Sequence, residues 1–72
     1  MQGQVKKIFA ERLKELRQQR NMSQMDLAVA TQLSQSAIAK WELSKTEPTA
    51  SAIVTLCNFF KETSDYLLGL SD

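Results

Sequence analysis

Apolar residues recur at helical spacing through the first part of this chain. Between them lie Lys, Glu, Arg and Gln, so the segment Val5–Gln19 is predicted to form one amphipathic helix. The apolar positions on its inner face are Val5, Ile8, Phe9, Leu13 and Leu16. No segment of the chain alternates at period two, so the pattern predicts an all-α fold class without a β-sheet.

Residues 23–42, SQMDLAVATQLSQSAIAKWE, predict two short helices with almost no spacer between them. Ser23 is a suitable N-cap for the first, with Asp26 completing a Ser-x-x-Asp capping box, and Ser34 is a suitable N-cap for the second. Two helices joined by three or four residues cross at a steep angle, so we expect the second to project outward. The inner faces consist of Leu27, Ala28 and Thr31 on the first helix and Ala37, Ile38 and Trp41 on the second.

The last third of the chain predicts two more helices after a loop with the sequence LSKTEP. Pro48 disfavours helix at the residue before it and is typical of the approach to a new helix. Thr49 is the expected N-cap of that helix, and Thr63 or Ser64 is expected to cap a short final helix that ends near YLLG. The inner face of the fourth helix consists of Ile53, Leu56, Cys57 and Phe60.

A chain of 72 residues without a repeat or a long linker is expected to fold as a single domain, residues 1–72, with residues 1–4 as a flexible N-terminal arm. Such a domain has little room for a catalytic cleft. The sequence contains no His, and Cys57 is expected to be a plain core thiol. Met22, Met25 and Trp41 are interpreted as packing residues. We therefore expect no enzyme activity, metal, cofactor or small-molecule ligand.

The net charge of +1 argues neither for nor against nucleic acid as a partner. No signal peptide or membrane span is visible, and a single cysteine fits a reducing compartment, so a cytoplasmic location is expected. Six basic residues in the first third form either a solvated helix face or a basic patch with a partner. They are Lys6, Lys7, Arg12, Lys14, Arg17 and Arg20.

The outward face of the helix that follows Ser34 is polar, with one long cation and no carboxylate. Its members are Gln35, Ser36, Ala39 and Lys40. In the major groove of DNA, a Gln amide pairs with adenine N6 and N7, and a Lys reaches guanine O6 or N7. The alternative is a solvent-exposed face without a partner.

Several sequence blocks, in unbroken order from about Phe9 to Gly69, resemble the Cro/lambda-repressor-type (XRE) helix-turn-helix family. They are FAERLKELR, SQMDLA, the S-x-x-x-I-x-x-WE pattern of Ser34–Glu42, the K-x-x-P pattern of Lys45–Pro48, and SDYLLG. The resemblance implies a lambda-repressor-like, compact five-helix bundle that binds double-stranded DNA through its second and third helices.

The resemblance also assigns expected roles to residues. Base reading would fall to the start of the third helix and the residues one turn later: Gln35, Ser36, Ala39 and Lys40. Phosphate contacts would come from the start of the second helix and the loop after the third: Gln24, Ser44, Lys45 and Thr46. Arg17 and Glu42 match a pair that ties the first helix to the end of the third. The alternative for this pair is a weak surface contact.

The chain departs from the family where glycine is usual, because Gln32, Ser44 and Lys61 occupy three turn positions. If the backbone keeps a positive φ there, each residue carries about 1 kcal/mol or more of strain. Because the surrounding helices fix these turns, we expect a positive φ at two or more of the three positions; otherwise the turns differ locally. Thr31 and Glu62 also replace the usual aliphatic residues, which weakens the core slightly.

These features predict a sequence-specific transcriptional regulator, a repressor, that binds DNA as a homodimer with its third helix in the major groove. The end of the chain has more apolar residues than one short helix can bury in a small core. The dimer interface is therefore expected among Tyr66, Leu67, Leu68 and Leu70. A C-terminus that simply closes the core is the alternative. A protein-interaction module on the same scaffold, antitoxin-like or adaptor-like, remains the alternative function. The chain is also compatible with the N-terminal part of a longer repressor.

Overall fold

The computed structural model describes residues 2–70 and the side chains of residues 4–70. Five helices follow one another: α1 (Gln2–Gln19), α2 (Gln24–Thr31), α3 (Gln35–Glu42), α4 (Ala50–Phe60) and α5 (Ser64–Leu68). No strand occurs within residues 2–70. The predicted all-α, five-helix fold is therefore confirmed.

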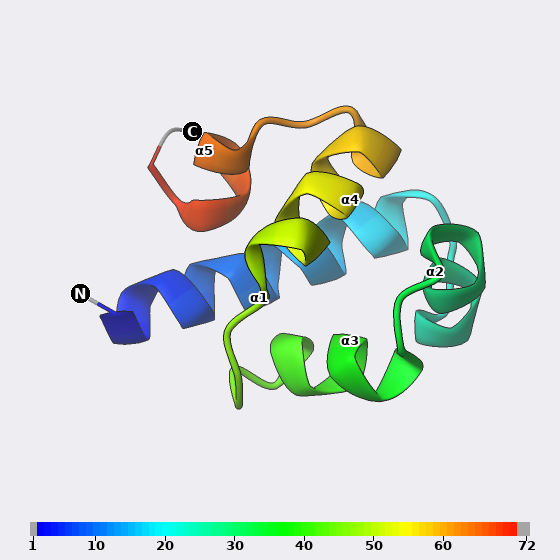
Figure 1. The fold of residues 1–72 in the computed structure, drawn as a ribbon, viewed down its shortest axis with the longest axis horizontal. Coiled ribbons are helices and arrows are strands. Elements are labelled where there is room, and N and C mark those ends of the chain that lie inside the picture. The colour runs from blue at the N-terminus through cyan, green and yellow to red at the C-terminus, as the bar shows by residue number, and fades with distance from the viewer. Residues whose placement is uncertain (1, 71–72) are drawn as a thin grey trace.

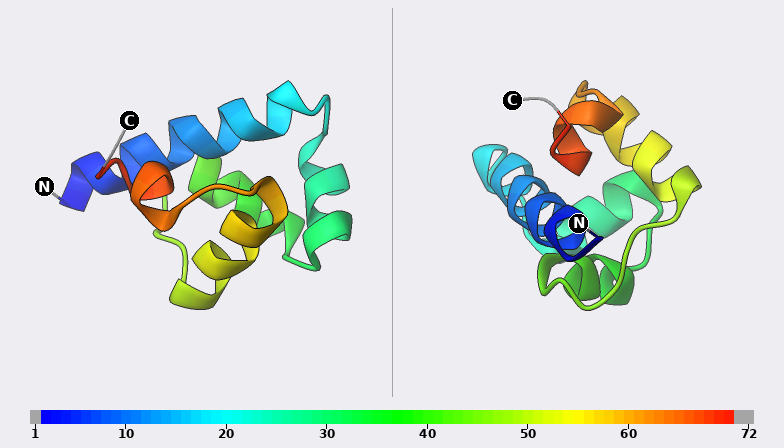
Figure 2. Two further views of the ribbon diagram at one scale, coloured as in Figure 1. Left: turned by 90° about the horizontal axis from the view of Figure 1, so that it is seen from above. Right: turned by 90° about the vertical axis from the view of Figure 1, so that its left-hand side faces the viewer.

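Helix α1 runs along the long direction of the molecule (Figure 1), and the other four helices lie to one side of it in the left-hand view of Figure 2. Helices α3 and α5 both pack against α1. They lie on opposite sides of the molecule, as Figure 1 and the right-hand view of Figure 2 both show. Helix α2 contacts α3 and α4, and α4 contacts α5, which closes the bundle. The short helix α3 thus lies at one edge of the fold, where α1 and α2 pack against it.

Helix α1 starts earlier than the sequence pattern predicted. It begins at Gln2 instead of Val5. Residues 2–4 therefore form its first turn, and the prediction that they belong to a flexible N-terminal arm is wrong. Residue 1 lies outside the described residues. The apolar spacing marks the part of a helix that is buried, whereas backbone hydrogen bonding extends beyond that part.

The N-caps of α2 to α5 are the Ser and Thr residues that the sequence predicted. Each cap has extended backbone geometry, and its hydroxyl accepts a hydrogen bond from the N–H three residues later. The caps are Ser23, Ser34, Thr49 and, of the two candidates for α5, Thr63. At Ser23 the Asp26 carboxylate also accepts from the cap N–H, which completes the predicted capping box.

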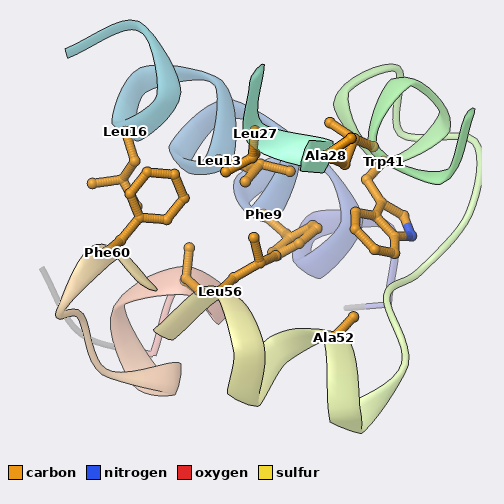
Figure 3. Close-up of a cluster of buried hydrophobic side chains, with 11 residues drawn as sticks. Phe9, Leu13, Leu16, Leu27, Ala28, Trp41, Ala52, Leu56 and Phe60 are labelled. Atoms are coloured by element: carbon orange, nitrogen blue, oxygen red, sulfur yellow. The ribbon is translucent and has the colours of Figure 1, made fainter. Parts of the chain in front are cut away.

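All five helices contribute to the core, and Figure 3 labels its members from α1, α2, α3 and α4. The side chains of six large residues in it are almost fully buried: Phe9, Leu13, Leu27, Ile38, Leu56 and Leu67. Trp41 packs edge-on against Phe9, with the ring centres 6.1 Å apart. The packing role predicted for Trp41 is thus confirmed. Met25 is 54% exposed, so the same prediction is wrong for that residue.

Within residues 2–70, four residues other than glycine have left-handed backbone conformations. Gln32, Ser44 and Lys61, the three residues at usual glycine positions, have φ values of 62°, 61° and 60°. The tertiary fold therefore keeps the family's turn geometry despite the Cβ atoms. Asn21, at φ 55°, ends α1 in the same way and was not predicted. Asn is one of the residues that tolerate this conformation best.

Candidate nucleic-acid interface

The turn between α2 and α3 consists of only three residues. Gln32 takes the left-handed conformation directly after α2, and Ser34 then caps α3. The Thr31 hydroxyl donates to the carbonyl of Leu27 at 2.7 Å, which satisfies this polar group at a usually aliphatic position. Helix α3 therefore runs at a steep angle to α2 along the edge of the molecule (Figure 1).

The outer face of α3 is polar. Gln35, Ser36 and Lys40 are exposed, whereas Ala39 is half-buried. On the opposite side of the helix, Ile38 and Trp41 are buried in the core. All four positions expected to read bases thus lie on α3, and three of them have exposed side chains.

The loop after α3 brings further polar side chains next to this face. Ser44 takes a left-handed conformation, and its N–H donates to the carbonyl of Trp41 at 3.0 Å. The N–H of Lys45 donates to the carbonyl of Lys40 at 2.9 Å, so the loop folds back on the end of α3. The side chains of Lys45 and Thr46 are exposed and that of Ser44 is half-buried.

Arg17 joins three elements through its guanidinium group. Its Nε lies 2.8 Å from Glu42 Oε2 and its Nη2 lies 2.9 Å from Glu42 Oε1, which makes a two-point ion pair between α1 and α3. Its Nη1 donates to the carbonyl of Met22 at 2.7 Å, just before the cap of α2. The side chains of Arg17 and Glu42 are only 11% and 4% exposed. The pair is therefore a largely buried bridge and not a weak surface contact.

Glu42 remains charged because of its partners. Burial acts to raise the pKa of Glu42, but hydrogen bonds from Arg17 and Gln24, together with the charges of Arg17 and Lys14, hold it below its ordinary value. In turn, the hydrogen bond to Glu42 raises the pKa of Arg17. The only carboxylate of α3 thus faces inward, where Arg17 neutralises it.

Gln24 is the first residue of α2 and is half-buried. Its Nε2 donates to Glu42 Oε1 at 3.1 Å. The side chain expected to contact phosphate therefore has an internal partner at the end of α3, which sequence reasoning missed. Gln24 and Glu42 are 18 positions apart, and no local pattern relates them.

Three of the six basic residues in the first third of the chain make contacts inside the fold. Two of them stack on aromatic rings: the guanidinium of Arg12 lies 4.4 Å from the ring centre of Tyr66, and that of Arg20 lies 5.0 Å from the ring centre of Phe59. Arg17 is paired with Glu42. The clustering of these residues in the sequence thus reflects contacts inside the fold for at least half of them.

The C-terminal apolar residues separate into different environments. Leu67 is fully buried in the core of its own chain, so its expected place in a dimer interface is corrected. Tyr66 and Leu68 are half-buried, and Leu70 is 71% exposed. Gly69 ends α5 at φ 80°, and a Cβ there would lie 2.8 Å from two Ile8 side-chain carbons. This close approach fixes the C-terminal turn against α1.

Other chemistry is sparse among residues 4–70. No group of His, Cys, Asp or Glu side chains there is arranged to hold a metal ion. Cys57 is half-buried, and its burial raises the pKa of its thiol. Among the described helices, none is long and apolar enough to cross a membrane.

The chain matches the helix-turn-helix family model over residues 13–67. It is 38% identical over 61 residues to the HTH-type transcriptional activator BcrR of Enterococcus faecalis, an alignment that covers 85% of this chain and 30% of the relative. It is 30% identical over 61 residues to the uncharacterized HTH-type transcriptional regulator YqaE of Bacillus subtilis (strain 168), covering 85% of this chain and 53% of the relative. No solved structure matches significantly.

The chain thus spans between about a third and about half the length of these relatives. The matched residues include α2, the turn and α3, the elements whose geometry is described above. The chain belongs to the Cro/C1-type (XRE) helix-turn-helix family.

Proposed function

We propose that this chain is a sequence-specific DNA-binding domain that regulates transcription. The observation that carries the proposal is the exposed face of α3, where Gln35, Ser36 and Lys40 lie without a carboxylate beside them. Glu42, the acidic residue of α3, is paired with Arg17 and turned away. Such a face matches the donor and acceptor groups of the major groove and the negative charge of the flanking phosphates.

Phosphate contacts in this proposal come from both sides of α3. Gln24 stands at the N-terminus of α2, where free N–H groups and the helix dipole favour an anion. Ser44, Lys45 and Thr46 follow α3 and would lie along the DNA backbone. Ala39, which is half-buried, would contribute at most an apolar contact, for instance with a thymine methyl group.

The proposed binding unit is a symmetric dimer, at least on DNA. Its two recognition helices would lie about 34 Å apart, one turn of B-DNA. For regulation we propose repression, in which the bound dimer hinders access of polymerase. The E. faecalis relative is described as an activator. A reporter gene with the selected site placed across its promoter therefore distinguishes repression from activation. Increased expression of the reporter would contradict repression.

The proposal is tested by selecting binders from a randomised DNA duplex library, followed by salt titrations of two variants. Lys45→Ala should weaken binding to the selected and a scrambled duplex alike and reduce the salt slope by about one unit, since it removes one phosphate contact. Gln35→Ala should cost about 1–3 kcal/mol on the selected site, little on scrambled DNA, and leave the salt slope nearly unchanged.

The outcomes separate the possible functions. Equal losses on both duplexes for Gln35→Ala would make it a backbone contact, and no loss on either would contradict the role of α3. Failure to enrich any sequence would contradict DNA binding. It would favour the alternative of a protein-interaction module on the same scaffold.

A further inference from the structure

The first residue of α2 and the last residue of α3 are joined by one hydrogen bond, from Gln24 Nε2 to Glu42 Oε1 at 3.1 Å. The accepting oxygen is not free to move, because it also accepts from Arg17 Nη2 at 2.9 Å while Oε2 accepts from Arg17 Nε at 2.8 Å. Glu42 is thus fixed by α1 and in turn fixes a side chain of α2. We propose that Glu42 is a positioning residue that presents the Gln24 amide to a DNA phosphate. The inference rests on the proposed DNA-binding function.

The chemistry of the two groups determines the direction in which the amide is held. A carboxylate only accepts hydrogen bonds, so Glu42 binds the nitrogen end of the Gln24 amide. That nitrogen carries two N–H groups, of which Glu42 uses one and a phosphate oxygen can accept the other. A Gln side chain at a helix end otherwise samples several rotamers, and ordering them on binding would lower the affinity.

The charge of Arg17 is necessary for this arrangement. An unpaired carboxylate beside a phosphate would repel it, but the two-point ion pair brings the local charge of Arg17 and Glu42 to zero. Arg17 also binds the carbonyl of Met22, directly before the Ser23 cap, at 2.7 Å. The same guanidinium therefore sets both the entry into α2 and the carboxylate that holds its first side chain.

A double-mutant cycle with Gln24→Ala and Glu42→Gln tests the inference. Gln24→Ala should weaken binding to the selected and the scrambled duplex by about five- to tenfold, the size expected for one lost phosphate hydrogen bond. Glu42→Gln should weaken it by a similar factor, because one of the two acceptor oxygens becomes an NH2 group and the remaining oxygen no longer serves both Arg17 and Gln24. The double variant should lose no more than either single variant, since both changes remove one contact.

Binding is measured at a temperature where circular dichroism shows every variant to be folded. Gln4→Ala is the matched control, because it removes an exposed amide at the far end of α1 and should bind as the wild type does. Losses that multiply in the double variant, or an unchanged affinity of Glu42→Gln, would overturn the inference while leaving DNA binding intact. Absence of wild-type binding to any duplex would instead contradict the proposed function itself.

A second measurement uses the unmodified protein, in case Glu42→Gln does not fold. The side-chain N–H signals of Gln24 in NMR spectra should be well separated and shifted from those of an exposed Gln in the free protein. They should shift again when duplex is added. Signals at the positions of an exposed, mobile amide in the free protein would overturn the inference without any variant.

Discussion

At the residue scale, the left-handed positions show how tertiary contacts override local preference. Gln32, Ser44 and Lys61 keep φ near 60° although each has a Cβ, which costs an L-residue about 1–2 kcal/mol. The prediction of positive φ at these positions is confirmed. The fold accepts the strain because the helices on either side of each turn are fixed by the core.

Replacing Gln32 by glycine should therefore stabilise the protein. Relief of backbone strain outweighs the entropy that glycine adds to the unfolded chain, for a net gain of about 0.5–1 kcal/mol. Urea unfolding measures the change. The matched control is Gln18→Gly, at an exposed position inside α1, which should destabilise by about 0.5–1 kcal/mol. A loss of stability in both variants would contradict the strain at Gln32.

The ion pair of Arg17 and Glu42 predicts a dependence of stability on pH. Because the pKa of Glu42 is lower in the folded state than in the unfolded state, its contribution is complete above the unfolded pKa and is lost as the pH falls through the folded pKa. Glu42→Gln should thus cost about 3–5 kcal/mol at pH 7, since it leaves Arg17 without its buried partner.

At pH 3 the cost of Glu42→Gln should be clearly smaller, because Glu42 in the unfolded chain is then largely protonated, which favours the unfolded state over the ion-paired folded state. Comparing the two proteins at each pH cancels the contribution of Asp26, whose pKa is also lowered, by its hydrogen bonds with Ser23. Denaturant titrations at both pH values measure the difference. An equal cost at pH 7 and pH 3 would show that the charge of Glu42 does not stabilise the fold.

At the element scale, two short helices depend on their caps. Helices α2 and α3 have eight residues each, a length that is marginal for an isolated helix in water. Their hydroxyl caps satisfy N–H groups that the first turn leaves without a partner. The Ser34 hydroxyl accepts from the N–H of Ala37 at 3.1 Å and fixes where α3 begins. Gln35, the proposed base-reading residue, follows directly.

Ser34→Ala should destabilise the protein by about 1 kcal/mol, because it removes this cap. Thermal unfolding followed by circular dichroism measures the loss. Ser36→Ala is the control within the same helix: Ser36 is exposed in the first turn but is not the N-cap, so alanine there should leave the stability unchanged or slightly raised. If both substitutions had the same effect, the cap would not be what defines the start of α3.

At the scale of the whole molecule, the apolar residues of α5 and of the turn after it lie in different environments. Leu67 closes the core of the chain itself, whereas Leu70 extends 71% of its surface into solvent beyond Gly69. Helix α5 lies on the side of α1 opposite α3, as Figures 1 and 2 show. An apolar contact around Leu70, flanked by Tyr66 and Leu68, would therefore join two copies without covering the face of α3.

Leu70→Asp should weaken dimer formation at least tenfold, because a carboxylate in a two-fold contact would face its own copy across the interface. Sedimentation velocity, with and without duplex, measures the association. Val54→Asp is the control: Val54 is 58% exposed on α4 and lies outside the proposed contact. A wild-type protein that stays monomeric at high concentration and binds DNA one copy at a time would contradict the dimer.

The sequence by itself determined which segments are helical, where four of them begin, and which side of each is buried. These properties depend on neighbours within one or two turns, so apolar spacing and hydroxyl caps predict them. The polar face of α3 was predictable for the same reason. The apolar spacing did not predict the start of α1 at Gln2, because a helix can extend beyond the face that it buries.

Only the tertiary structure decided which groups meet across the chain. The bond of Gln24 to Glu42, the stacking of Arg12 on Tyr66, and the burial of Leu67 within its own core depend on how α1 packs against α3 and α5. Partners so far apart in the sequence share no periodicity. Their contact arises because one core excludes water around all five helices, and this packing brings each polar group at its edge to a particular neighbour.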